Sequence, residues 1–388
     1  MGNYNFDTIV SREGTASVKY DLREKIFNNG SVMPMWVADM DFETPDFIRQ
    51  AIEKRVEHPI YGYSFRDDNY TSSIQNWIRR RHNWDTESDW FVFSPGIVPA
   101  VNFAVLSLTQ PGDGILIQPP VYFPFYGAVK DHQRELLTNQ LIYENGEYSI
   151  DFDDFEQKAR QVKLFIMSSP HNPVGRVWTR DELSKMGEIC LRHGVIILSD
   201  EIHNDLILPG NQHTVMATIS DEIANQTLTC IAPSKTFNMA GLATSSVVIS
   251  NPDLRKKFAG FIDRLHLAGG NLFGSVASVA GYTHGEVWVD ELMNYVANNV
   301  RYLGDFLQSQ TSVQMIEPQA TYMAWLDFRA TELDDDTIKN RLISEAGVGL
   351  SPGPVFGAGG EGFQRINLAT PFSIVKEAAS RIASTFAE

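Results

Sequence analysis

The chain has 388 residues, which is long enough to form two or more domains around large apolar cores. Its formal net charge of −16 argues against binding to nucleic acid or to an anionic membrane, because both are bound by basic patches. Only two cysteines are present, and no Cys/His cluster has metal-ligand spacing, so we expect a reducing compartment and no metal site.

The first 15 residues are polar and lack the apolar core of a signal peptide. No apolar run approaches the roughly 18 residues that are needed to span a bilayer. The sequence therefore predicts a cytoplasmic protein that does not enter a membrane.

Short apolar runs alternate with helical patterns between about residues 90 and 250. This alternation predicts an α/β fold with a mostly parallel sheet flanked by helices. Several runs are almost entirely apolar, as is typical of strands that are covered on both faces. The predicted strands are Trp90–Ser94, Gly114–Gln118, Leu164–Ser168, Val195–Ser199, Leu228–Ala232 and Ser245–Ser250, and the helices between them include Pro99–Leu108 and Arg180–His193.

The pattern changes after Glu286. A long helix is predicted to about Gln310, and Tyr322–Asp327 alternates like a half-exposed strand. A helix, a glycine-rich loop, a strand and a final helix follow, with the loop at Ser351–Gly362 and the strand around Arg365–Leu368. We therefore predict a large domain over 46–285 and a smaller α+β domain over 286–388. The first 45 residues are predicted to be an arm that packs on the smaller domain.

Polar motifs follow three of the predicted strands. Asn172 lies in 169–175, Asp200 begins Asp-Glu-Ile-His, and Lys235 lies in Pro-Ser-Lys-Thr-Phe-Asn. Each motif alone has an ordinary explanation, such as a turn, a helix cap or a surface lysine. However, ligands of open α/β sheets bind at the carboxyl ends of the strands, and the three motifs fall together there.

An amide, a carboxylate and a lysine at one rim suit pyridoxal phosphate. The lysine forms a Schiff base, the acid holds the ring nitrogen protonated, and the amide bonds the phenolate oxygen. The cofactor's phosphate needs a further site. Residues 94–99, Ser-Pro-Gly-Ile-Val-Pro, join a strand to a helix, and the N–H groups at such a helix start bind dianions, although the same pattern fits a plain turn.

These motifs resemble those of the fold-type-I pyridoxal-phosphate enzymes in the class I/II aminotransferase superfamily. The resemblance extends over nearly the whole chain and rests on Ser-Pro-His-Asn-Pro-Val-Gly, Ser-Asp-Glu-Ile-His and Ser-Lys-Thr-Phe-Asn. More narrowly, 36–42 and 61–64 resemble the cystathionine β-lyase, or C–S lyase, branch. Related sequences in that branch are often described simply as aminotransferases.

The resemblance implies a role for each matching residue. Lys235 carries the cofactor and moves the Cα proton, Asp200 pairs with the ring nitrogen, and Tyr122 stacks on the ring. Arg365 binds the substrate α-carboxylate through two parallel hydrogen bonds, with the Ala38 backbone nearby. The cofactor contacts also include Gly96, Ile97, Val98, Ser234, Asn172 and, from the other subunit of a homodimer, Tyr63.

The sequence departs from the aminotransferase pattern in two places. Many aminotransferases have a phosphate-binding arginine shortly after the lysine, but Asn238–Ala243 contains none. His203 stands where many have tyrosine, which agrees with the lyase branch and leaves its role open between ring contact and packing. The glycines of 357–362 lack the Lys-Ser/Thr of a phosphate loop and predict a mobile loop before Arg365.

The resemblance implies β-elimination from a sulfur amino acid. Cystathionine is the expected substrate, with cysteine and its S-conjugates as alternatives, and the products are a thiol, pyruvate and ammonia. An aminotransferase is the nearest alternative, because it shares every step up to loss of the Cα proton. A non-catalytic ligand-binding regulator on the same fold is disfavoured by the intact set of polar residues and by the absence of a basic segment.

Overall fold

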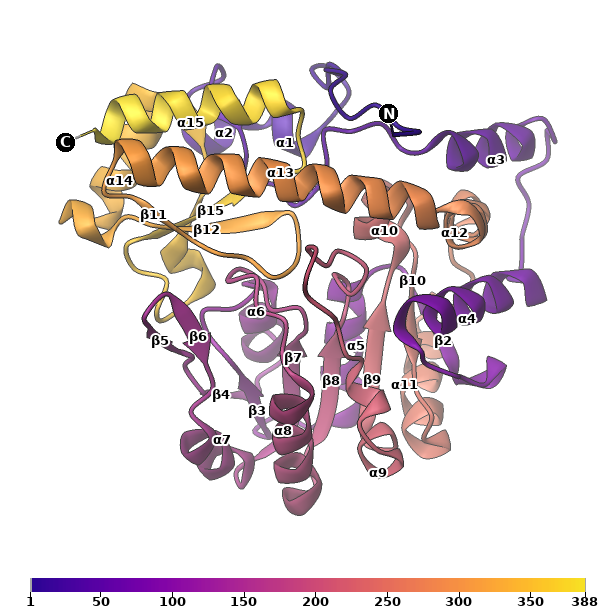
Figure 1. Cartoon of the computed structure of the whole chain (residues 1–388). Helices are drawn as coiled ribbons and strands as arrows, with labels where there is room; N and C mark the ends of the chain where they lie inside the picture. Colours follow the sequence, from indigo (N-terminus) through magenta and orange to yellow (C-terminus); the bar gives the residue numbers. More distant parts are fainter. Residues whose placement is uncertain (1, 388) are drawn as a thin grey trace.

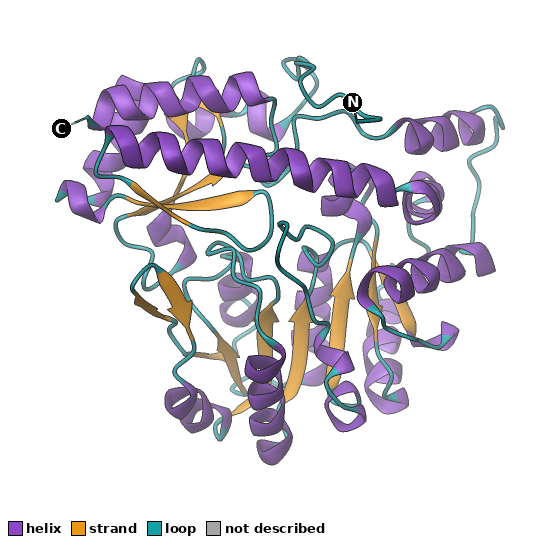
Figure 2. Cartoon of the chain, viewed as in Figure 1, coloured by secondary structure: helices purple, strands orange, loops and turns teal. Residues whose placement is uncertain are grey.

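The computed structural model describes residues 2–387. Two sheets organise the chain: a seven-stranded sheet in the lower part of Figure 1, and a four-stranded sheet beneath the helices at the top. Figure 2 shows helices on both faces of the larger sheet. No helix within 2–387 is both long and apolar enough to cross a membrane.

The seven-stranded sheet has the order β2-β10-β9-β8-β7-β3-β4. All neighbouring pairs are parallel except the two that involve β10, so β2 again runs in the same direction as β9. The carboxyl ends of β2, β7, β8 and β9 therefore meet at one rim. The strands are β2 Phe91–Ser94, β3 Gly114–Ile117, β4 Glu135–Thr138, β7 Val162–Ser168, β8 Ile196–Asp200, β9 Thr227–Ile231 and β10 Ser245–Val248.

Helices cover both faces of this sheet. On one face α5 Ile97–Leu108, α6 Pro124–Lys130 and α11 Pro252–Arg264 share a buried core with the strands. On the other face α7 Phe152–Ala159, α8 Arg180–His193 and α9 Asp221–Ala224 do the same. Thr179 and Glu182 form a reciprocal capping box that sets the start of α8.

Helix α12 joins the large sheet's edge to two early helices. It spans Leu272–His284 and packs against α3 Asp46–Val56 and α4 Asp68–His82. Its Gly281 faces Phe237 so closely that a Cβ would lie 2.7 Å from the Phe237 ring. The short helix α10, Pro233–Thr236, ends one residue before Phe237, so α12 supports the helix that carries Lys235.

The four-stranded sheet, β11-β12-β15-β14, lies under the long helix α13 and the final helix α15 (Figure 1). The early segment joins this unit, because β1 pairs in parallel with β13. A separate hairpin, β5-β6, lies beside it. The elements are β1 Met33–Pro34, β5 Ile142–Glu144, β6 Glu147–Ser149, α13 Glu286–Gln310, β11 Gln314–Ile316, β12 Met323–Asp327, α14 Asp335–Arg341, β13 Val348–Gly349, β14 Ser351–Pro352, β15 Phe363–Asn367 and α15 Phe372–Phe386, with α1 Val18–Asp21 and α2 Arg23–Phe27 in the arm.

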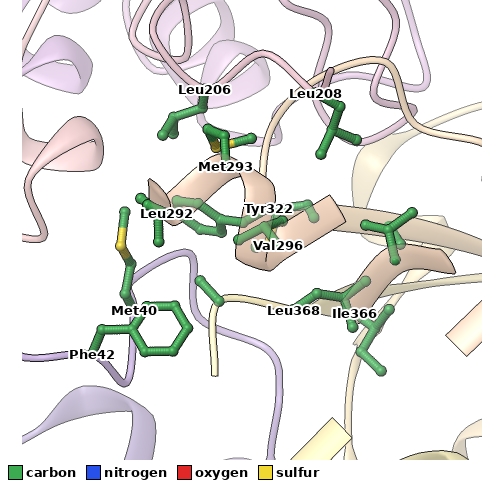
Figure 3. Close-up of a cluster of buried hydrophobic side chains, with 14 of the residues drawn as sticks. Met40, Phe42, Leu206, Leu208, Leu292, Met293, Val296, Tyr322, Ile366 and Leu368 are labelled. Atoms are coloured by element: carbon green, nitrogen blue, oxygen red, sulfur yellow. The ribbon is translucent and has the colours of Figure 1, made fainter. Parts of the chain in front are cut away.

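One buried cluster ties these parts together. Figure 3 shows side chains of the early segment, the loop after β8, α13, the residue before β12, and β15 around one centre. Met40 and Phe42 belong to it, as do Leu292 and Val296 of α13. Because distant parts of the chain contribute, the early segment is part of the folded core rather than a loose extension.

The predicted fold class is confirmed, and all six predicted strands of the large sheet are present within two residues at each end. Three local expectations are wrong. Helix α5 begins at Ile97 and not at Pro99, because Gly96 already lies at the N-cap position. The strand 322–327 is fully buried, not half-exposed, since both of its faces are covered. The glycine-rich segment 351–362 also contains strand β14 and a short 3-10 turn, Gly353–Phe356.

Candidate active site

A cavity of about 200 Å³ lies at the rim where the strands of the large sheet end. Its walls come from the early segment, the loops after β2, β7, β8 and β9, and the turn before α6. The lining residues are Ala38, Pro95, Gly96, Ile97, Val98, Pro99, Tyr122, Ser168, Asn172, Asp200, Ile202, His203, Ser234, Lys235, Ala240, Ala243 and Thr244. Ten of the twelve predicted site residues are therefore brought together, all except Tyr63 and Arg365.

Lys235 lies in the short helix α10, directly after β9. Its Nζ donates a hydrogen bond of 2.6 Å to the carbonyl oxygen of Ala38. Burial lowers the pKa of Lys235 to about 8, while the Asp39 carboxylate raises it and the Arg365 guanidinium lowers it further. A buried amine with such a pKa is neutral in an appreciable fraction near pH 7, and a neutral amine is a nucleophile and a base.

Asp200 is the last residue of β8 and is 5% exposed. Burial raises the pKa of Asp200 to about 7, although the Ile202 N–H, 3.2 Å from Oδ1, and the Lys235 charge lower it. A cationic partner would stabilise the ionised form of this buried carboxyl group, because its charge would offset the cost of desolvation.

Arg365 lies on β15, an internal strand of the smaller sheet, and is 4% exposed. One guanidinium nitrogen donates to Asn172 Oδ1 at 3.0 Å, and the other donates to the Trp36 carbonyl at 3.0 Å. The Nε has no hydrogen-bond partner within 2–387. Because Asn172 uses its oxygen for Arg365, its Nδ2 remains available to donate towards the cavity.

Burial lowers the pKa of Arg365 to about 10, so the group stays cationic at neutral pH. Its guanidinium carbon lies 4.8 Å from the centre of the Phe356 ring. An arginine in this position is available for an anion that enters from the cavity, and it is neither on the surface nor on an edge strand.

Two aromatic side chains line the cavity. The phenol of Tyr122 has a raised pKa, first through burial and then through the Asp200 charge. His203 is buried, and burial together with the charges of Lys235 and Arg365 lowers its pKa to about 3, so its ring is neutral. The His203 Nδ1 has no partner among the described residues. Its position in the cavity wall would allow His203 to contact the ring of a bound cofactor.

The other end of the cavity lies at the start of helix α5. Gly96 precedes α5, so the first N–H groups of this helix, at Ile97 and Val98, have no partner within the helix. Ser234 lines the same cavity. Ala243 and Thr244 also line the cavity, in the region after Lys235 where the sequence lacks an arginine.

Tyr63 does not line the cavity of its own chain. It lies in the extended segment between α3 and α4 and is fully exposed, with Phe65 85% exposed beside it. An exposed tyrosine and phenylalanine on an extended segment form an apolar surface that is available to a second chain.

Sequence reasoning missed Tyr322. Its ring packs in the buried cluster of Figure 3, and its hydroxyl donates 2.9 Å to the same Ala38 carbonyl that accepts from Lys235. Tyr322 directly precedes β12, but no local pattern shows that it faces residue 38. Ser168, Ala240 and Thr244 were missed for the same reason, although the first ends a predicted strand.

The side chains around the cavity fit pyridoxal phosphate. A buried amine can bind its aldehyde, a buried carboxyl lacks the cation that the ring nitrogen would supply, and a free amide N–H faces the cavity. The start of α5 can accept its phosphate. Within the described residues no group of three or more His, Cys, Asp or Glu side chains could hold a metal ion.

The family of class I and II aminotransferases matches residues 31–382. Cystathionine beta-lyase PatB of Bacillus subtilis is 43% identical over 97% of this chain and 98% of its own length. The pyridoxal-phosphate structure of cystalysin from Treponema denticola has a TM-score of 0.96 at 37% identity, with 98% of each chain covered. The pyridoxal-phosphate-bound C–S lyase of Staphylococcus hominis has a TM-score of 0.93 at 33% identity, with 100% of this chain and 99% of that chain covered.

Proposed function

Because this chain belongs to the class I and II aminotransferase family, we propose that it is a pyridoxal-phosphate-dependent C–S β-lyase. Cystathionine is the proposed substrate, with cysteine and its S-conjugates as alternatives. The single observation that carries the proposal is that Lys235, Asp200 and Asn172 line one cavity, with Arg365 hydrogen-bonded to Asn172 behind its wall.

We assign the cofactor contacts as follows. Lys235 binds the aldehyde covalently, Asp200 pairs with the ring nitrogen, and Tyr122 covers one face of the ring. The start of α5 would hold the phosphate. The groups assigned to it are the N–H groups of Gly96, Ile97 and Val98, the Ser234 hydroxyl, and Tyr63 of a second subunit, while Asn172 donates to the phenolate oxygen and His203 contacts the ring.

Arg365 is assigned to the substrate's α-carboxylate. The guanidinium is already held on one side by the Trp36 carbonyl and by Asn172, so little side-chain entropy remains to be lost on binding. This fixed geometry orients the substrate about its Cα, with the Ala38 backbone beside it. The Cα–H bond is thereby held towards Lys235.

When bound, the cofactor supplies an electron sink for the pair left at Cα after proton removal. Once the substrate amine has displaced it from the cofactor, Lys235 Nζ would take that proton in its neutral form, which the low-polarity surroundings favour. The bond from the β-carbon to sulfur then breaks, and the sulfur leaves as a thiolate. The three-carbon remainder hydrolyses to pyruvate and ammonia, while the buried walls keep water from Cα before that point.

We also propose a cytoplasmic homodimer with shared active sites, supported by the exposed Tyr63–Phe65 segment. The formal net charge of −16 supports a small-molecule substrate rather than a nucleic-acid partner. The proposed division of the chain remains an arm over 1–45, a large domain over 46–285 and a small domain over 286–388.

The test is to incubate the purified protein with L-cystathionine and, separately, with an amino acid plus 2-oxoglutarate. Pyruvate, thiol and glutamate are then measured. A lyase forms pyruvate and thiol in equal amounts from cystathionine without a 2-oxo acid. Glutamate formation without pyruvate would contradict the proposal and assign the chain as an aminotransferase.

A further inference from the structure

The backbone of residues 36–40 holds the polar side chains of the site. The carbonyl of Trp36 accepts from Arg365, and the carbonyl of Ala38 accepts from both Lys235 and Tyr322. The other three carbonyls of the segment also accept side-chain hydrogen bonds, from Asn367 at residues 37 and 39 and from Asn238 and Arg12 at residue 40. A shift of this segment would therefore move the lysine and the arginine of the site together.

Two cations of the N-terminal arm fix the same segment through its carboxylates. Arg12 bonds both oxygens of Asp39, at 2.9 and 2.5 Å, and also bonds Asp41 at 2.9 Å. Lys19 Nζ bonds Asp41 at 2.7 Å and lies 3.9 Å from Asp39. In addition, the Trp36 indole N–H donates to the Lys19 carbonyl at 3.2 Å.

The Lys19–Asp41 pair of this network is buried, while Arg12 and Asp39 are each 21% exposed. Lys19 is 1% exposed and Asp41 is 6% exposed. The free energy needed to remove such charges from water is about as large as the free energy that their attraction provides. A buried ion pair is therefore weak evidence for stability. One use of such a pair is to fix a single geometry. The Asp39 carboxylate raises the pKa of the Lys235 amine. The ion pair with Arg12 places a compensating positive charge beside this carboxylate.

We propose that Arg12 and Lys19 are positioning residues of the active site. By binding Asp39 and Asp41 they fix the 36–40 segment, which in turn holds the Lys235 amine and the Arg365 guanidinium in place. The inference rests on the proposed function and extends it to two residues that do not line the cavity. It predicts that substitutions of Arg12 and of Asp39, the two partners of one ion pair, shift the pKa of Lys235 in opposite directions.

The prediction follows from the charges that face Lys235. Asp39 and Asp200 raise the pKa of Lys235, while burial and Arg365 lower it. The polar groups around it also include Tyr322, which shares its acceptor, and Tyr122 and His203, which line the same cavity. Loss of the Arg12 charge leaves Lys19, at 3.9 Å, as the cation beside Asp39 and raises the pKa of Lys235. Loss of the Asp39 charge lowers it.

The experiment uses the full-length chain freed of cofactor, as the wild type and as Arg12→Gln and Asp39→Asn. Acylation of Lys235 by a small activated ester, which transfers its acyl group to the neutral amine and releases its alcohol, is followed by mass spectrometry as a function of pH. The midpoint should move up for Arg12→Gln and down for Asp39→Asn. Midpoints that stay unchanged, or that move in the same direction, overturn the proposal, because they would show that the Arg12–Asp39 pair does not act on the Lys235 amine.

In the cofactor-loaded enzyme, Lys19→Met should lower kcat/KM for cystathionine on the order of 10- to 100-fold, as expected for a small displacement of reacting groups. Arg12→Lys keeps the charge but not the paired bonds, so its acylation midpoint should stay near that of the wild type. The matched control is Arg23→Gln, which breaks the arm's pair with the 63% exposed Glu13 and should change neither quantity. Failure of the proposed function is distinguishable, because the acylation midpoints do not depend on lyase activity.

Discussion

At the scale of single residues, Lys235 is an amine whose burial and charged neighbours keep its pKa near 8. Lys235→Ala should abolish turnover, because both the covalent bond to the cofactor and the base at Cα are lost. The chain should remain folded, since Lys235 makes one hydrogen bond and lies in a cavity wall. Steady-state assays beside circular dichroism check this. Near wild-type activity in the variant would assign the covalent bond to another lysine.

Asp200 is expected to lower the stability of the cofactor-free chain. Its pKa rises from 3.8 to about 7 on folding, so the folded state binds the proton more tightly than the unfolded state. The stability that the group contributes is therefore complete below about pH 4 and is lost as the pH rises to 7. Asp200→Asn should raise the free energy of unfolding of the cofactor-free chain at pH 8 by about 1–4 kcal/mol.

The same variant should bind pyridoxal phosphate more weakly, because the amide cannot pair with a ring cation. Urea unfolding at pH 4 and pH 8 measures the first effect, and a cofactor titration measures the second. The stability gain should disappear at pH 4, where wild-type Asp200 is protonated as well. A gain of equal size at both pH values would mean that the effect is not one of charge.

Arg365 tests the assignment of the substrate carboxylate. A charge-assisted hydrogen-bonded pair contributes about 1.5–3 kcal/mol, so losing it should cost about 2–4 kcal/mol. Arg365→Ala should therefore lower kcat/KM for cystathionine roughly 30- to 1000-fold, and Arg365→Lys should restore only part of it. Binding of a simple amine to the cofactor should be unchanged, as monitored by the cofactor's absorbance. Equal losses for both ligands would show that Arg365 acts mainly through Asn172 and Trp36.

The sequence predicted these residues because each one belongs to a local motif. Lys235, Asp200 and Asn172 follow apolar strands, and Arg365 is the one cation in its apolar run. Tyr322 could not be predicted in the same way, since its role depends on a contact with a carbonyl 284 positions away. The ion pairs of Arg12 with the segment around Asp39 are likewise contacts between loops, which periodicity does not report.

At the scale of elements, local signals decided which boundaries could be predicted. Helix α8 begins and ends as expected because Thr179 caps its start and Gly194 adopts a left-handed conformation at its end. The start of α5 was missed, because the two apolar residues after Gly96 carry no capping signal of their own. The burial of β12 depends on β15 and on the helices above it. The alternation of residues within 322–327 carries no information about these distant elements.

The contact between Gly281 of helix α12 and Phe237 offers a test of how this helix supports the segment that carries Lys235. Gly281→Ala places a Cβ 2.7 Å from the Phe237 ring, and overpacking of this kind costs about 1–3 kcal/mol. Urea unfolding should show that loss, and cofactor affinity should fall with it, since Phe237 lies two residues from Lys235. Gly260→Ala in α11 is the matched control. Its nearest neighbour would be 4.0 Å away, so it should stabilise the chain by about 0.5–1 kcal/mol. Similar effects of both changes would contradict the packing account.

At the scale of the whole molecule, the exposed Tyr63 segment predicts a dimer whose sites need both subunits. Lys235→Ala and Tyr63→Ala should each be nearly inactive, but after mixing and subunit exchange one site of each hybrid is intact. If the subunits redistribute at random, about a quarter of the wild-type activity should return. Light scattering should give twice the mass of 43.6 kDa. An active monomer at high dilution would contradict the shared site.

The long-range hydrogen bonds of residues 36–40 also bear on protein synthesis. The carbonyl of Ala38 can accept its hydrogen bond only after Lys235 has been synthesised. The carbonyl of Trp36 can do so only after Arg365, which is 329 positions later, has been synthesised. At about 5–20 residues per second, a ribosome needs roughly 6–26 s to travel from codon 235 to codon 365. During that interval the nascent chain contains Lys235 and Asp200, but not the arginine that is assigned to the substrate carboxylate. Cofactor captured before release would therefore be held in a site without substrate selectivity, and full activity can arise only after the last strand, β15, has been made.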